Sequence, residues 1–159
     1  MKLQKVGIAG CGVMGAGIAQ VVLSHGYQVT ILEVNKVTLE KGVRNVQHGI
    51  ETMLKKRIIT SEDYEKALNR LSGTVCPTDL ADCDLIIEAV FEDLQTKTTL
   101  LKALDSVCKR HTIFASNTSS FSISKMAAAT SRPERVIGLH FLNPVPVMTL
   151  VEIVRTIVT

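Results

Sequence analysis

Short apolar runs alternate with longer amphipathic segments along the chain, and this alternation predicts the order of its secondary structure. The predicted strands span residues 5–9, 28–33, 73–76, 84–89, 112–115, 135–141 and 149–157. The predicted helices span residues 13–24, about 36–57, about 60–71, 94–108 and 122–129. Such strand–helix alternation favours an α/β fold with a doubly wound, mostly parallel sheet, in which the two helices between residues 36 and 71 form an insertion.

The composition excludes several classes of protein. The 159 residues are 46% apolar and 21% charged, as in an ordinary globular domain, and one domain is expected at this length. No apolar run reaches the roughly 18 residues that a membrane span requires. A net charge of +3 and six aromatic residues offer little for nucleic-acid binding. Residues 1–5 lead directly into residues 6–10, which form the first strand and the start of a glycine turn, so we expect no signal peptide.

The cysteines indicate the redox environment. Cys11, Cys76, Cys83 and Cys108 show neither a CxxC pair nor a metal-ligand spacing. We therefore expect reduced thiols, no bound metal and an intracellular, cytoplasmic protein.

A glycine-rich turn follows the first strand. Gly10, Gly12 and Gly15 form a GxGxxG pattern, which is weak alone but here joins a buried strand to a helix. In such a turn the first glycine permits the tight bend, the second lets a pyrophosphate approach the backbone, and the third allows close packing of helix and strand. Free N–H groups at the helix start would face the anion. The alternative is a glycine-rich turn that binds nothing.

An acidic residue at the end of the second strand supports dinucleotide binding. Glu33 lies 18 residues after Gly15, near the spacing expected in dinucleotide-binding folds. Its carboxylate is expected to hydrogen-bond the ribose hydroxyls and to repel a 2′-phosphate, which favours NAD over NADP. Lys36 is close enough in sequence to weaken that preference, and an exposed strand-end carboxylate without a ligand is the alternative.

Of the four histidines, His140 is the candidate general base. It ends an apolar strand, at the sheet edge where ligands bind in folds of this class. By contrast, His25, His48 and His111 lie at a helix end, on a solvated helix face and in a charged turn. Glu152 in the following strand is placed to hold the imidazole in one tautomer. The alternative for His140 is a buried neutral imidazole with a structural role.

Two further polar features are predicted near the same edge. Residues 116–120, Ser-Asn-Thr-Ser-Ser, follow a strand, and their hydroxyls either orient a substrate oxygen or cap the next helix. Lys97 occupies a position where the stripe of helix 94–108 predicts an apolar residue. Its side chain either snorkels to solvent or presents its ammonium to a ligand beside Glu92.

Four segments together resemble one family. They are residues 10–19 (GCGVMGAGIA), 87–90 (IEAV), 116–120 (SNTSS) and 140–148 (HFLNPVPVM), of which the last two are more specific than the glycine turn. They are similar to the NAD-binding domain of 3-hydroxyacyl-CoA dehydrogenases, in particular the short-chain bacterial 3-hydroxybutyryl-CoA dehydrogenases. The resemblance covers essentially the whole chain and implies a Rossmann-type fold, NAD as cofactor and an acyl-CoA substrate.

The resemblance also implies roles for individual residues. The catalytic histidine falls on His140, its carboxylate partner on Glu152, and the serine that contacts the substrate oxygen on Ser119. Lys56 is suggested for the phosphates of coenzyme A. The implied cofactor contacts are Gly10, Gly12, Val13, Met14, Gly15, Glu33, Glu92, Lys97, Ser119 and Asn143. The implied reaction is reversible hydride transfer between C3 of a (3S)-3-hydroxyacyl-CoA and the nicotinamide, with the histidine moving the hydroxyl proton.

This chain departs from the family pattern in details and in length. Leu142 stands where Phe is usual and Glu33 where Asp is common, and neither change removes a functional group. The family continues into a helical C-terminal domain that supplies most of the dimer contact and an active-site asparagine. We therefore expect residues 1–159 to be the NAD-binding part of a two-domain, homodimeric enzyme, and the isolated chain to bind NAD but to be weakly active or inactive.

Two other hypotheses remain open. One is a different β-hydroxyacid dehydrogenase, although those typically use a lysine where this chain offers His140 with Glu152. The other is a non-enzymatic nucleotide-binding or structural protein, such as the lens crystallins that share the fold. The presence of His140, Glu152 and Ser119 together counts against it, because a binding protein of that kind would need none of them.

Overall fold

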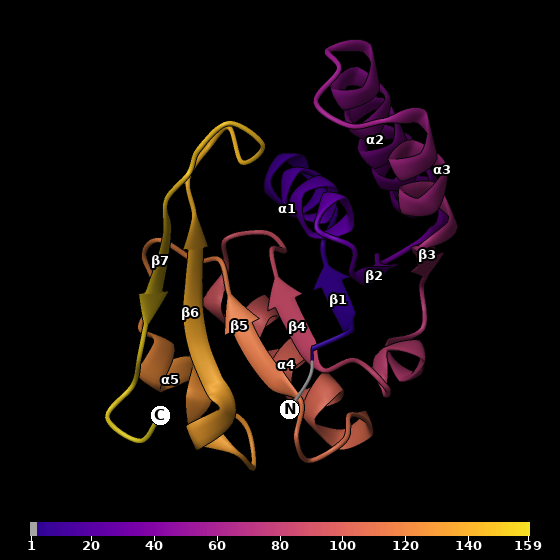
Figure 1. Cartoon of the computed structure of the whole chain (residues 1–159). Coiled ribbons are helices and arrows are strands. Elements are labelled where there is room, and N and C mark those ends of the chain that lie inside the picture. The colour runs from indigo at the N-terminus through magenta and orange to yellow at the C-terminus, as the bar shows by residue number, and fades with distance from the viewer. Residues whose placement is uncertain (1–2) are drawn as a thin grey trace.

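The computed structural model describes residues 3–159, which form a seven-stranded sheet with the strand order β3-β2-β1-β4-β5-β6-β7 (Figure 1). Every neighbouring pair is parallel except β6 and β7, which are antiparallel. The strands are β1 (Lys5–Ala9), β2 (Gln28–Leu32), β3 (Leu71–Thr74), β4 (Leu85–Glu88), β5 (Ile113–Ser116), β6 (Val136–Phe141) and β7 (Val151–Val154). The helices are α1 (Val13–Ser24), α2 (Lys36–Lys55), α3 (Ser61–Asn69), α4 (Leu94–Val107) and α5 (Ile123–Ala127), with short 3-10 turns at Pro77–Leu80 and Pro133–Arg135. The expected Rossmann-type α/β fold is confirmed.

Two hydrophobic cores lie on the two faces of the sheet. Ile8 and Ile87 point to one face and pack with residues of α1, α2 and α3. Ile86 and Phe114 point to the other face and pack with residues of α4 and α5. Because successive side chains of a strand alternate between faces, each central strand contributes to both cores, and the central part of the sheet is buried on both sides.

The helix starts show how local sequence sets the element boundaries. The side chain of Asn35 accepts a hydrogen bond from the N–H of Thr38 at the start of α2. Thr60 and Asp63 form a reciprocal capping box at the start of α3. Helix α1 differs, because its N-cap is Gly12 and no side chain caps it. The N–H groups of its first turn therefore stay available at the carboxyl edge of the sheet.

Two strand predictions differ from the structure by two residues or more at an end. The strand expected at 73–76 begins two residues earlier, at Leu71, because β3 is an edge strand whose limits follow its pairing with β2. The strand expected at 149–157 is only Val151–Val154, since its pairing with β6 stops there. The residue types of Leu71–Thr74 and of the C-terminal run 149–157 do not indicate where either strand begins or ends.

No helix among residues 3–159 is both long enough and apolar enough to cross a membrane. Met1 and Lys2, which belong to the segment considered for a signal peptide, lie outside the described residues.

Candidate active site

The glycine turn between β1 and α1 has the shape that a bound pyrophosphate requires. Gly10 has φ +88°, and a Cβ on it would lie 2.7 Å from the carbonyl oxygen of Ala89. A Cβ on Gly15 would lie 1.9 Å from the carbonyl oxygen of Gly10, so helix and strand approach too closely there for any side chain. A Cβ on Gly12 would meet no atom within 4 Å, which leaves open space beside the uncapped start of α1. The turn thus combines free N–H groups with room for an anion.

A first cavity, of about 140 Å³, lies next to this turn between the ends of β1, β2 and β4. Its lining is almost entirely apolar and is formed by Ala9, Gly10, Leu32, Glu33, Val34, Val75, Pro77, Val90 and Leu100. Glu33 is the only charged residue among them. Gly10 and Glu33 are recognisable in the sequence, whereas the apolar lining is not, because its members come from several separate segments.

The carboxylate of Glu33 faces the glycine turn. Its Oε1 accepts a hydrogen bond of 2.5 Å from the backbone N–H of Cys11, and its Oε2 accepts one of 3.3 Å from the N–H of Val34. These bonds hold the carboxylate at the end of β2, beside the apolar cavity. Both oxygens therefore already accept a backbone N–H bond within the protein, and the predicted bonds to ribose hydroxyls would be additional to these.

A second cavity, of about 400 Å³, lies at the ends of β4, β5 and β6. Six of the residues proposed from the sequence line it together, namely Met14, Glu92, Lys97, Ser119, His140 and Asn143. The other lining residues are Ala89, Val90, Asn117, Phe141 and Leu142. The structure thus brings together side chains from segments as far apart as α1 and the loop after β6.

The antiparallel pairing of β6 and β7 places His140 directly opposite Glu152. His140 Nδ1 lies 2.8 Å from Glu152 Oε2. A carboxylate can only accept a hydrogen bond, so Nδ1 is the donor when Glu152 is ionised, and Nε2 of a neutral imidazole is then free to accept a proton. The imidazole is one-quarter exposed at the cavity, while the carboxylate is 55% exposed. This arrangement can perform general acid–base chemistry.

The loop after β5 is held in place by its own polar side chains. Asn117 Oδ1 accepts the backbone N–H of Phe141 at 2.8 Å, which ties this loop to the end of β6. Ser122, rather than any residue of 116–120, caps the next helix. Ser119 is exposed and lines the second cavity. Within residues 3–159 its hydroxyl has no hydrogen-bond partner, so it is available to a ligand.

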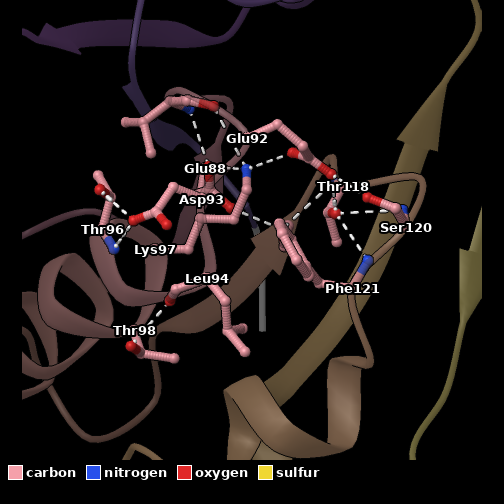
Figure 2. Close-up of polar contacts among 12 residues, drawn as sticks. Glu88, Glu92, Asp93, Leu94, Thr96, Lys97, Thr98, Thr118, Ser120 and Phe121 are labelled. Atoms are coloured by element: carbon pink, nitrogen blue, oxygen red, sulfur yellow. Dashed lines mark hydrogen bonds and ion pairs between the residues drawn. The ribbon is translucent and has the colours of Figure 1, made fainter.

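Lys97 is buried, and the snorkelling alternative is wrong. Only 1% of its side chain is exposed, and its ammonium lies 2.7 Å from Glu88 Oε1 and 3.0 Å from Glu92 Oε2 (Figure 2). Glu88 is fully buried and was missed by the sequence analysis, although an acidic residue at the end of the run Leu85–Glu88 was an available signal. An ammonium buried this deeply needs such paired carboxylates.

Glu92 connects this ion pair to the loop after β5. It accepts hydrogen bonds from the hydroxyls of Thr118 and Ser120, the latter at 2.7 Å (Figure 2). Partial burial alone would raise the pKa of Glu92, but these hydroxyls and the Lys97 ammonium outweigh it and hold the pKa below its usual value. The carboxylate therefore stays ionised at the cavity wall.

Lys56 lies outside both cavities. It is the C-cap of α2 and is exposed, at the turn that connects the two inserted helices. Neither cavity includes it among its lining residues. Its suggested role toward coenzyme A remains a prediction.

A family model and curated relatives connect the chain with the same enzyme family. The family described as "3-hydroxyacyl-CoA dehydrogenase, NAD binding domain" matches residues 5–159. A probable 3-hydroxybutyryl-CoA dehydrogenase of Bacillus subtilis is 40% identical over 159 residues, which are 100% of this chain and 55% of that protein. The 3-hydroxybutyryl-CoA dehydrogenase of Bradyrhizobium diazoefficiens is 43% identical, covering 99% of this chain and 54% of that protein.

Solved structures agree with these relatives. The crystal structure of M. tuberculosis FadB2 superposes with a TM-score of 0.96 at 42% identity, covering 100% of this chain and 56% of that one. The (S)-3-hydroxybutyryl-CoA dehydrogenase of Ralstonia eutropha superposes with a TM-score of 0.95 at 42% identity, covering 99% of this chain and 56% of that one. The chain thus spans about half the length of the curated relatives and solved structures that it matches.

Proposed function

The chain belongs to the family of 3-hydroxyacyl-CoA dehydrogenase NAD-binding domains, and from this premise we propose that it binds NAD and supplies the acid–base pair for reversible oxidation of a (3S)-3-hydroxyacyl-CoA at C3. The observation that carries the proposal is the His140–Glu152 pair, 2.8 Å apart, with His140 at the wall of the second cavity. A protein that only bound a nucleotide would have no use for an oriented imidazole.

The residues present fit NAD. The uncapped start of α1 and the open space at Gly12 suit the pyrophosphate. The apolar first cavity suits the adenine ring, with Glu33 beside it for the neighbouring ribose. The second cavity, which contains Lys97, Ser119 and Asn143, remains for the nicotinamide half and the reacting end of the substrate.

In the oxidation direction, His140 Nε2 takes the proton from the C3 hydroxyl. Bound NAD supplies the hydride acceptor. Glu152 holds the imidazole by accepting the Nδ1–H bond, and its charge stabilises the imidazolium that forms. Ser119, whose hydroxyl is unpaired within residues 3–159, orients the substrate oxygen. In the reduction direction the imidazolium returns its proton to that oxygen.

The substrate class follows from the names of the relatives. Those of Bradyrhizobium and Ralstonia are named for 3-hydroxybutyryl-CoA. We therefore propose a short-chain acyl-CoA, with acetoacetyl-CoA as the oxidised form, and Lys56 as a contact for the phosphates of coenzyme A. We further propose that the whole protein is a cytoplasmic homodimer with residues 1–159 as its NAD-binding domain.

The proton-transfer role is tested by following NADH absorbance with acetoacetyl-CoA under single-turnover conditions, so that slow reaction is still measured. His140→Asn is expected to reduce the rate by about 10²–10⁴-fold, the range typical of general acid–base catalysis. His25→Asn serves as the control, because His25 is exposed at the end of α1. A rate in His140→Asn within threefold of the wild-type rate would contradict the proposal.

The cofactor assignment is tested by calorimetric titration with NAD and NADP. We expect tighter binding of NAD, because a 2′-phosphate would approach the Glu33 carboxylate. Replacing Glu33 with Ala is expected to reduce the difference between the affinities for NAD and NADP. Equal affinity of the unaltered protein for both nucleotides would refute the role of Glu33.

A further inference from the structure

Glu88 is a buried carboxylate that the proposed reaction does not use. It ends β4 with its side chain 0% exposed. Its Oε1 accepts hydrogen bonds from the Lys97 ammonium at 2.7 Å and from the N–H of Val90 at 2.8 Å, and its Oε2 accepts one from the hydroxyl of Ser116 at 2.6 Å. These donors compensate for the loss of water around a buried carboxylate, but an apolar strand end would need none of them.

The charges around Glu88 do not cancel. Glu88, Lys97 and Glu92, which we call the carboxylate–ammonium cluster, contain two carboxylates and one ammonium (Figure 2). The other groups bonded to the cluster are backbone atoms of Val90 and side-chain hydroxyls, which carry no formal charge. The cluster thus has one net negative charge, and Lys97 is the only lysine or arginine among the described residues that line the second cavity.

The second acidic group at this cavity does not offset that charge. Glu152 pairs with His140, so this pair is negative while the imidazole is neutral. Glu92 and Lys97 are the charged residues that line the cavity, and their charges offset each other. Glu88, bonded to Lys97, and Glu152, bonded to His140, each add one negative charge next to a lining residue. A net negative charge around a cavity with low-dielectric walls favours a ligand of the opposite sign.

The two redox states of the cofactor differ in this property. The nicotinamide ring of NAD⁺ is positively charged, whereas that of NADH is neutral, and the remainder of the molecule is the same. We propose, on the basis of the proposed function, that Glu88 is a specificity-determining residue that shifts the binding preference of the second cavity toward NAD⁺ relative to NADH. Its negative charge, held behind Lys97 and Glu92, stabilises the positive ring and has little effect on the neutral one.

The magnitude follows from Coulomb's law. A unit charge acting over several ångströms at the effective dielectric constant of partly buried sites changes an equilibrium constant by on the order of tenfold. Because contacts to the adenosine and pyrophosphate are common to NAD⁺ and NADH, they cancel in the ratio of the two dissociation constants. That ratio reports the charge at the ring.

The experiment measures the dissociation constants of NAD⁺ and NADH calorimetrically for the unaltered protein and for Glu88→Gln. We expect NAD⁺ binding to weaken about tenfold in the variant and NADH binding to change by less than about threefold. Glu88→Asp keeps the charge and is expected to keep the ratio, even if both constants shift. Glu134→Gln is the matched control, because it removes an exposed carboxylate that precedes β6, at the opposite end of that strand from His140.

The outcomes separate the two proposals. Equal weakening of NAD⁺ and NADH in Glu88→Gln, or an unchanged ratio, would show a purely structural role and overturn the inference. Failure of the unaltered protein to bind either form would instead contradict the proposed function. If circular dichroism shows that Glu88→Gln does not fold, Glu92→Gln removes the same unit charge at a side chain that is 42% exposed. The ratio should then shift in the same direction, and a constant ratio would overturn the inference.

Discussion

Replacing Lys97 with Met tests how strongly the fold depends on its buried ion pair. The Lys97 ammonium and the Glu88 carboxylate lie 2.7 Å apart, with side chains 1% and 0% exposed. Met preserves much of the length of Lys but leaves the carboxylate with only the Val90 N–H and the Ser116 hydroxyl. Removing one partner of a buried pair costs about 3–5 kcal/mol, because the other charge stays uncompensated in the interior. For a domain of this size the melting temperature should fall by roughly 6–20 °C.

A matched control separates burial from distance. The exposed pair Lys66–Glu62 is shorter, at 2.5 Å, but its side chains are 56% and 76% exposed. Water and salt screen such a pair, so Lys66→Met should leave the stability almost unchanged. The lysine in the longer, buried ion pair should therefore contribute more to stability than the lysine in the shorter, exposed pair.

A double variant then tests the cause. In Lys97→Met with Glu88→Gln both charges are gone, and the protein should recover most of the stability lost in Lys97→Met. The measurement is urea unfolding followed by circular dichroism, with the midpoints compared at equal slopes. A loss below about 1 kcal/mol in Lys97→Met, or a double variant no more stable than the single one, would refute the reasoning.

Three further predictions concern the glycine turn, the thiols and the acid range. Gly12→Ala should weaken NAD binding, measured by calorimetry, but leave the melting temperature unchanged, because its Cβ would meet no atom within 4 Å. Gly15→Ala should lower the melting temperature, because its Cβ would lie 1.9 Å from a carbonyl oxygen. Equal melting temperatures of the two variants in thermal unfolding would contradict the packing argument. Burial raises the pKa of the Cys11 thiol to about 12. In the native protein at pH 8, iodoacetamide should therefore alkylate the exposed Cys76 far faster than Cys11, as mass spectrometry of the peptides would show. Equal alkylation rates of the two thiols would be inconsistent with a buried Cys11. Two backbone N–H groups at the start of β1 hold the pKa of Asp84 below its usual value. The contribution of Asp84 to stability is therefore full above the unfolded-state pKa of about 4 and is lost as the pH falls through the lower folded-state pKa. Asp84→Asn should flatten the rise of stability with pH in this range, as urea unfolding would show, and an unchanged pH profile would contradict this prediction.

Much of the candidate site was predictable because its signals are local. A positive φ at Gly10 and the missing Cβ at Gly15 are requirements of one tight turn, and the pattern of glycines expresses them within six residues. His140 and Glu152 are adjacent because two successive strands pair in an antiparallel register, which is a short-range consequence of the chain's order. Their roles in catalysis stay predictions.

Other parts of the site could not be read from neighbouring residues. The lining of the apolar cavity takes Leu32, Val75 and Leu100 from different elements, and each resembles an ordinary core residue in its own segment. For Lys97 the helical stripe left two alternatives, and only the packing of α4 against β4 shows that the ammonium is buried against Glu88. Lys56 carries no local signal that places it relative to either cavity.

The sequence by itself determined the order of the elements, the glycine turn and the candidate acid–base pair, because periodicity, backbone freedom and neighbouring strands act over a few residues to a dozen. The tertiary structure alone decided which charges share a dry interior. Strand β4 lies between β1 and β5, so Glu88 is aligned with Ala9 and Ser116, residues far from it in the sequence. The energy of a charge depends on everything that surrounds it in space, and this long-range property is not contained in any local pattern.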